Sequence, residues 1–189
     1  MINILTKKIE DSLTESEDIE LVKTIDDQFP YPLDNFQKHA CFRTSKNENV
    51  LVTAHTGSGK SVCGEHAILE SIRLGKKAIY TSPIKSLSNQ KFSEFTKKFG
   101  DKMSIGILTG DIKFNPDAQC VIMTTEILRN ILYRNKNSDE TDVMKYDIHP
   151  SEIGVVIFDE VHYFNDPDRG KVLEETLVLL DREVSLIML

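Results

Sequence analysis

One stretch decides the fold of this chain: Val50-Leu51-Val52-Thr53-Ala54-His55-Thr56-Gly57-Ser58-Gly59-Lys60-Ser61. It begins with an apolar segment, predicted as a strand over Val50–Ala54, and leads through a glycine-rich turn into a helical pattern over Lys60–Leu74. A strand-to-helix turn that ends in Lys-Ser is typical of loops that hold the phosphates of a nucleoside triphosphate. Ala54 stands where the general pattern Gly-x-x-x-x-Gly-Lys-Ser/Thr has its first glycine.

Each residue type in this turn suits phosphate and magnesium. Gly57 and Gly59 lack a Cβ, so the backbone can direct successive N–H groups at phosphate oxygens. Lys60 supplies a positive charge for the β- and γ-phosphates, and the Ser61 hydroxyl is a hard oxygen ligand for Mg²⁺. The predicted nucleotide-binding loop therefore comprises Ala54, His55, Thr56, Gly57, Ser58, Gly59, Lys60 and Ser61.

A second motif follows another predicted buried strand, Val155–Phe158, and reads Asp159-Glu160-Val161-His162. We expect Asp159 to hold the same Mg²⁺, together with Ser61, through water molecules that the ion releases reluctantly. Glu160 is placed to orient and deprotonate an attacking water. Two such motifs together predict an ATPase with ATP and Mg²⁺ as its cofactors, in which Lys60, Asp159 and Glu160 act on the phosphates.

A dinucleotide-binding fold is the other interpretation of a glycine-rich turn. It requires Gly-x-Gly-x-x-Gly and an acidic residue about twenty positions further on. Val62 stands where the last glycine should be, and Lys76-Lys77 occupies the region where the acidic residue is required. The sequence therefore disfavours this alternative.

Strands and helices alternate through the rest of the chain. Such alternation predicts an α/β fold with a parallel sheet covered by helices on both faces and with ligands at the carboxyl ends of the strands. Further strands are expected at Lys77–Thr81, Ile105–Leu108, Cys120–Met123 and Val184–Leu189. Further helices are expected at 33–43, from Ser82-Pro83 to Phe99, from Thr124 or Thr125 to Arg134, and at Lys171–Leu180.

Composition bounds the function classes. The 189 residues are 40% hydrophobic and 28% charged, with a formal net charge of −7, so no global basic field attracts nucleic acid. Three scattered cysteines and the lack of an apolar run of about 18 residues predict a soluble intracellular protein without a membrane partner. Residues 1–28 are interpreted as an exposed acidic arm, and 135–153 as a polar surface loop.

Several further motifs carry a family resemblance. Thr81-Ser82-Pro83-Ile84-Lys85-Ser86-Leu87-Ser88-Asn89-Gln90-Lys91 is followed in order by Leu108-Thr109-Gly110-Asp111, Met123-Thr124-Thr125-Glu126-Ile127-Leu128-Arg129 and Phe158-Asp159-Glu160-Val161-His162-Tyr163. On these residues the chain resembles the first RecA-like domain of superfamily 2 DExH-box helicases, and most closely the superkiller-type RNA helicases that work with the RNA exosome. The resemblance implies a RecA-like P-loop NTPase domain over residues 29–189.

The resemblance also implies roles for residues outside the two ATP motifs. Tyr31 would stack on the adenine base, and the Gln37 amide would read its edge. His162 would couple the γ-phosphate to a second motor domain and to RNA, while a transition-metal role is disfavoured beside two hard carboxylates. Contacts to nucleic-acid phosphates are expected from Pro83, Lys85, Gln90, Thr109, Gly110, Thr125 and Glu126.

The function that follows is an ATP-dependent RNA helicase, of which this chain would be the ATP-binding motor half. The chain ends at Leu189, where the family continues into a Ser-Ala-Thr motif, so the second RecA-like domain is expected to be a missing partner. RNA, single-stranded or partly duplex, is the expected substrate, and RNA-decay machinery a partner by analogy. A DNA helicase or translocase and a non-catalytic nucleotide-binding module remain as alternatives.

Overall fold

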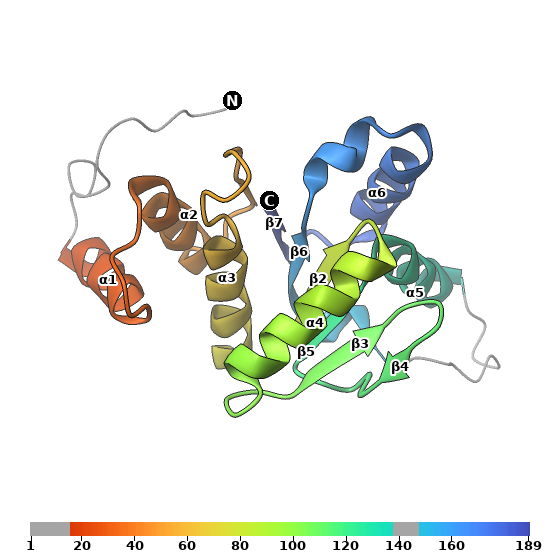
Figure 1. Cartoon of the computed structure of the whole chain (residues 1–189), viewed down its shortest axis with the longest axis horizontal. Coiled ribbons are helices and arrows are strands. Elements are labelled where there is room, and N and C mark those ends of the chain that lie inside the picture. The colour runs from red at the N-terminus through yellow and green to blue at the C-terminus, as the bar shows by residue number, and fades with distance from the viewer. Residues whose placement is uncertain (1–15, 138–147) are drawn as a thin grey trace.

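The computed structural model describes residues 16–137 and 148–189. In these residues seven strands form one sheet in the order β1-β7-β6-β2-β5-β3-β4 (Figure 1). All neighbouring strands are parallel except the short edge strand β4, which is antiparallel to β3. The strands are β1 Val50–Leu51, β2 Lys77–Ser82, β3 Ile105–Leu108, β4 Lys113–Phe114, β5 Cys120–Thr124, β6 Ile153–Phe158 and β7 Ser185–Met188.

Helices cover both faces of this sheet, as predicted. Those described are α1 Ser16–Asp27, α2 Asn35–Ser45, α3 Ser61–Arg73, α4 Lys85–Phe99, α5 Thr125–Asn137 and α6 Pro167–Leu179, with short 3-10 turns at Pro150–Glu152 and Val161–Asn165. Side chains of a strand alternate between the faces. Tyr80 of β2 therefore packs with α3 and α4, whereas its neighbour Ile79 packs with α5 and α6. Both faces are apolar, which explains why the central strands read as continuous hydrophobic runs.

The N-terminal region differs from the exposed acidic arm that we predicted. Residues 16–27 form helix α1, which lies beside α2 (Figure 1). Val22 and Ile25 of α1 are buried in a small cluster with Phe42 of α2 and Val62 of α3. An acidic outer face and an apolar inner face thus coexist on one helix, so the arm interpretation is wrong for these residues. The rest of the predicted arm, residues 1–15, lies outside the described residues.

Other boundaries shift for local reasons. Helix α4 starts at Lys85 rather than at Ser82-Pro83, because Ser82 is the last residue of β2 and its buried hydroxyl bonds that of Ser88 at 2.7 Å. Helix α6 starts four residues before the predicted Lys171, because the Asp166 carboxylate caps it. Strand β4 was not predicted. Of the predicted loop at 135–153, residues 138–147 lie outside the described residues, and 135–137 belong to α5.

His66 joins the three N-terminal helices. Its ring is fully buried in α3, with Nδ1 2.8 Å from Gln28 Oε1 after α1 and Nε2 2.8 Å from Ser45 Oγ at the end of α2. Because Oε1 only accepts, Nδ1–H donates to it, and Nε2 accepts from the serine hydroxyl. Burial lowers the pKa of His66. His66 is therefore a structural residue that ties α3 to the ends of α1 and α2.

We therefore expect His66 to make the free energy of unfolding smaller as the pH is lowered. A lowered pKa in the folded state means that the unfolded chain binds the proton more readily, so stability is present above the unfolded value of about 6.5 and is lost as pH falls below it. Melting temperatures between pH 5 and 8 should show this loss, and His66→Gln should flatten it. His55→Asn, at an exposed imidazole, is the matched control and should leave the slope unchanged. An unaltered slope in His66→Gln would contradict the assignment.

Candidate nucleotide and nucleic-acid site

The predicted motifs meet at one edge of the sheet. The glycine-rich loop follows β1, and the Asp159-Glu160 pair follows β6. Strand β7 lies between these two strands, and the backbone N–H of Val161 donates to Leu189 O at 2.9 Å. The segments after β2, β3 and β5 emerge at the same edge, because all these strands are parallel. Ligands of parallel α/β sheets bind at this edge.

The glycine-rich loop has the backbone that phosphate binding requires. Gly57 and Gly59 have φ of 84° and 82°, a region that side chains disfavour. A Cβ on Gly59 would lie 2.6 Å from Gln37 Nε2, so glycine is also required by space. Helix α3 begins at Ser61, directly after the loop, and its dipole favours an anion at this end.

Polar groups of the loop fit a triphosphate. Lys60 Nζ donates to Ala54 O at 2.7 Å, which curls the lysine back over its own loop. Ser58 Oγ is buried and has no hydrogen-bond partner among the described residues. Phosphate oxygens would supply hydrogen-bond acceptors for the Ser58 hydroxyl, the Lys60 ammonium and the first N–H groups of α3. His55 and Thr56 of the predicted loop are exposed beside them.

Asp159 is held in place by a tyrosine that the sequence analysis missed. Tyr80 O–H donates to Asp159 Oδ2 at 2.6 Å, and the Glu160 backbone N–H donates to Oδ1 at 3.0 Å. Burial foremost, with the charge of Asp159, raises the pKa of Tyr80 well above its ordinary value. The phenol therefore keeps its proton and orients the carboxylate. A tyrosine in the middle of a predicted buried strand, where its hydroxyl needs a partner, is the signal that could have found it.

Glu160 lies close to Asp159 in an unusual backbone conformation. Its φ of 56° and ψ of 45° are left-handed, which is rare for a residue other than glycine and typical of functional sites. The Glu160 side chain is 40% exposed, and its Oε2 lies 3.2 Å from His162 Nδ1. His162 is 69% exposed and packs against the Tyr163 ring. Both side chains can thus reach a ligand outside the sheet edge.

The two predicted adenine contacts differ in availability. Tyr31 is exposed and tilted against Phe29, with ring centroids 6.0 Å apart, so its outer face is free to stack. Gln37 is 5% exposed. Its Oε1 accepts from Asp34 N at 2.9 Å, and its Nε2 donates to Gly59 O at 3.0 Å. Gln37 thus ties helix α2 to the glycine-rich loop.

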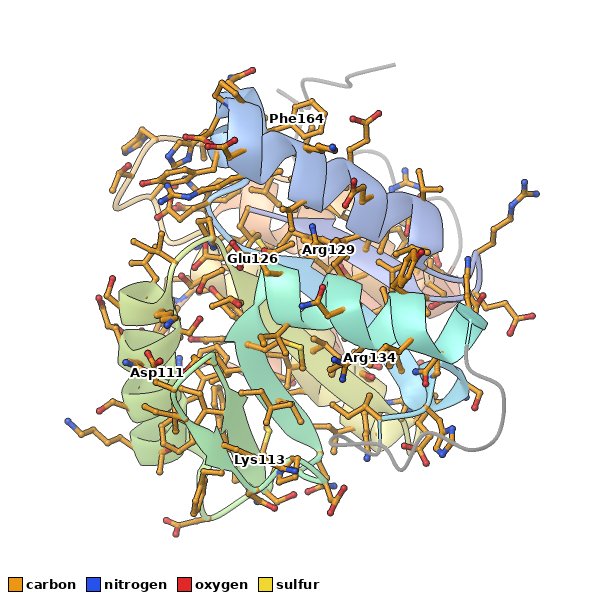
Figure 2. The ribbon with its side chains drawn as sticks, turned by 90° about the vertical axis from the view of Figure 1, so that its right-hand side faces the viewer. Asp111, Lys113, Glu126, Arg129, Arg134 and Phe164 are labelled. Carbon is orange, nitrogen blue, oxygen red and sulfur yellow. The ribbon has the colours of Figure 1, made fainter. Side chains whose placement is uncertain are left out.

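The predicted nucleic-acid residues fall into three groups. Lys85 Nζ pairs with Asp111 Oδ2 at 2.8 Å and lies over Gly110, next to the tight turn that buried Thr109 makes with Ile112. Pro83, Thr125 and Glu126 instead line a small cavity of about 20 Å³ that Asp159 and Glu160 also line. Figure 2 shows Asp111 near α4 and Glu126 at the start of α5. The second group thus lies beside the two carboxylates that the sequence predicts to be catalytic.

Gln90 is the third case. It is an exposed residue of helix α4, and its Nε2 donates to Glu94 Oε1 at 2.8 Å. No contact described in residues 16–137 and 148–189 brings Gln90 to Lys85 or to Thr125. The structure therefore does not join it to the other nucleic-acid candidates.

Comparison with known proteins identifies the family. A sequence model described as DEAD/DEAH box helicase matches residues 34–189. The chain belongs to this helicase family. The antiviral helicase SKI2 of Saccharomyces cerevisiae is 47% identical to this chain, over 90% of this chain and 12% of that protein. The exosome RNA helicase MTR4 of Homo sapiens is 46% identical, over 86% of this chain and 14% of that protein. The predicted superkiller-type resemblance is confirmed.

These relatives are much longer than this helicase chain, which spans about an eighth of the length of those it matches. A solved structure, the DUF1998 helicase MrfA bound to DNA and AMPPNP, superposes with a TM-score of 0.65 over 96% of this chain and 27% of that one, at 19% identity. The RecA-like α/β fold expected from the sequence is confirmed. In the described part of the helicase, no helix is long and apolar enough to cross a bilayer.

Proposed function

We propose that this chain is the ATP-binding motor domain of an ATP-dependent RNA helicase, which couples ATP hydrolysis to RNA translocation and unwinding. The observation that carries the proposal is the meeting of the glycine-rich loop and the Asp159-Glu160 pair at one edge of a parallel sheet. The name of the exosome RNA helicase MTR4 points to RNA as the nucleic acid, and it also supports RNA-decay machinery as a partner.

The chain's own residues have separate tasks in this proposal. The loop N–H groups and Lys60 bind and orient the β- and γ-phosphates, and Ser61 and Asp159 hold the Mg²⁺, which supplies charge stabilisation in phosphoryl transfer when bound. Tyr80 keeps Asp159 oriented through its 2.6 Å hydrogen bond. Glu160 orients the water and accepts its proton at a carboxylate oxygen. Tyr31 stacks on adenine. His162, whose Nδ1 lies 3.2 Å from Glu160 Oε2, lies on the side of the site where the γ-phosphate binds.

Nucleic acid would bind through local contacts rather than a basic field. Lys85 and the Thr109-Gly110 turn form one contact, and the start of α5 at Thr125 forms another. Such backbone and hydroxyl donors bind phosphates without reading sequence. An acidic chain with a net charge of −7 can thus hold RNA. A second RecA-like domain would supply the arginine groups that stabilise transition-state charge, so these 189 residues alone should bind ATP weakly and turn over slowly.

The test is ATP hydrolysis by the natural full-length protein that carries these residues, with no nucleic acid, with single-stranded RNA and with DNA of matched sequence. Stimulation by RNA and not by DNA is expected, and Glu160→Gln should abolish it. Stimulation by DNA equal to or greater than that by RNA would replace the proposal with a DNA helicase or translocase. ATP binding without any turnover would leave a nucleotide-binding module.

A further inference from the structure

One face of helix α4 points at the nucleotide site. Phe95 packs edge-on against Tyr80, with ring centroids 5.2 Å apart, and Tyr80 is the residue that orients Asp159. One turn further on, Lys98 pairs with Glu65 of α3 at 2.6 Å. Residues at i, i+4 and i+7 share a helix face. Lys91, four residues before Phe95, therefore lies on the same face, at the level where α3 begins.

Lys91 reaches the predicted magnesium ligand. Its Nζ donates to Ser61 Oγ at 3.4 Å, across thirty residues of sequence. Its side chain is only 17% exposed, and a second bond to Glu94 Oε2 at 3.0 Å holds the ammonium in place. The hydrogen bond from Gln90, followed by the pairing with Lys91, lowers the pKa of Glu94. Glu94 is thus a fixed negative charge that keeps Lys91 beside Ser61.

The position is unusual because a side-chain cation bonds the oxygen that is the predicted magnesium ligand. Mg²⁺ takes hard oxygen ligands at about 2.1 Å, so it would use the same Ser61 oxygen that Lys91 now bonds. Two positive charges a few ångströms apart repel each other strongly in a partly desolvated site. Lys91 is also not one of the residues that hold phosphate in the glycine-rich loop. Its bond to Ser61 therefore opposes metal binding rather than assisting it.

We propose that Lys91 is a positioning residue that competes with Mg²⁺ for the Ser61 oxygen, and that the metal binds there only when the lysine ammonium is displaced. This inference rests on the proposed function, since it assigns the control of that same site. Glu94 determines how strongly Lys91 competes with Mg²⁺, because its carboxylate holds the lysine ammonium in place. Lys91 thereby raises the Mg²⁺ concentration at which the nucleotide complex forms.

The test is binding of a fluorescent ATP analogue to the 189-residue chain during Mg²⁺ titration, which reads binding and not hydrolysis. In Lys91→Met the half-saturating Mg²⁺ concentration should fall at least about threefold, because a neighbouring positive charge is removed. Glu94→Gln should shift it in the same direction by less. Lys97→Met removes an equal charge from an exposed position of the same helix and should leave the value unchanged. Melting curves verify that each variant is folded.

A double variant separates a direct effect from a general one. In Ser61→Ala there is no hydroxyl for either cation, so adding Lys91→Met should no longer shift the Mg²⁺ dependence. An unchanged or higher Mg²⁺ requirement in Lys91→Met alone would overturn the inference, because Lys91 would then assist the bound nucleotide. If Lys97→Met lowered the Mg²⁺ requirement as much, the shift would come from the net charge of the chain and not from the contact with Ser61. The inference would then also fail. Absence of any Mg²⁺-dependent binding by the wild-type chain would remove the proposed function itself.

Discussion

Replacing Glu160 with glutamine is expected to lower RNA-stimulated ATP hydrolysis by about two to four orders of magnitude while ATP still binds, because general base catalysis contributes an effect of this size. Glutamine keeps the length and polarity of the side chain but cannot accept the proton of the attacking water. The Glu160 side chain is 40% exposed and pairs with His162, which is itself 69% exposed, so its replacement should not unfold the domain. The measurement is turnover and ATP affinity in the natural full-length protein.

A matched control is Glu183→Gln, at an exposed acid outside the sheet edge that carries the motifs. It should leave both turnover and affinity unchanged. A loss of less than tenfold in Glu160→Gln would contradict the role of general base. A parallel loss of ATP affinity would show that Glu160 acts in binding rather than in proton transfer.

Replacing Lys60 with methionine is expected to weaken ATP binding by about one to two orders of magnitude, because one positive charge at the β- and γ-phosphates is lost from a partly desolvated site. The Lys60 ammonium donates to Ala54 O of its own loop rather than tying two elements of the fold together, so the fold should survive the replacement. Calorimetric titration with Mg-ATP measures the change, and Lys97→Met serves as the equal-charge control. ATP affinity within twofold of wild type would refute phosphate binding by Lys60.

The sheet and both ATP motifs could be predicted because they depend on local signals. Buried parallel strands read as short apolar runs, and the turn from Ala54 to Ser61 is specific to one strand-to-helix geometry. Strand β4 was missed because two exposed residues at a sheet edge carry no hydrophobic pattern. Helix α1 was missed because acidic residues on its outer face masked the apolar pair Val22 and Ile25.

The supporting contacts of the site could not be predicted, since each joins residues far apart in sequence. Tyr80 meets Asp159 across 79 positions, and Lys91 meets Ser61 across 30. Only the register of β2 beside β6, and the packing of α4 over the same face, bring these pairs together. Residue type alone gives no sign that Tyr80 or Lys91 would contact a residue of the predicted nucleotide site. The Gln37 amide similarly had an expected ligand, whereas the structure shows it bonded to Asp34 and Gly59.

The most direct test of the central claim is a crystal structure of this chain with a nucleotide, beryllium fluoride and Mg²⁺. The account predicts phosphates on the backbone N–H groups between Gly57 and Ser61, and a metal ion at about 2.1 Å from Ser61 Oγ with Asp159 reached directly or through water. Lys91 should then have left Ser61. A nucleotide bound away from this edge of the sheet, or a metal that contacts neither Ser61 nor Asp159, would contradict it.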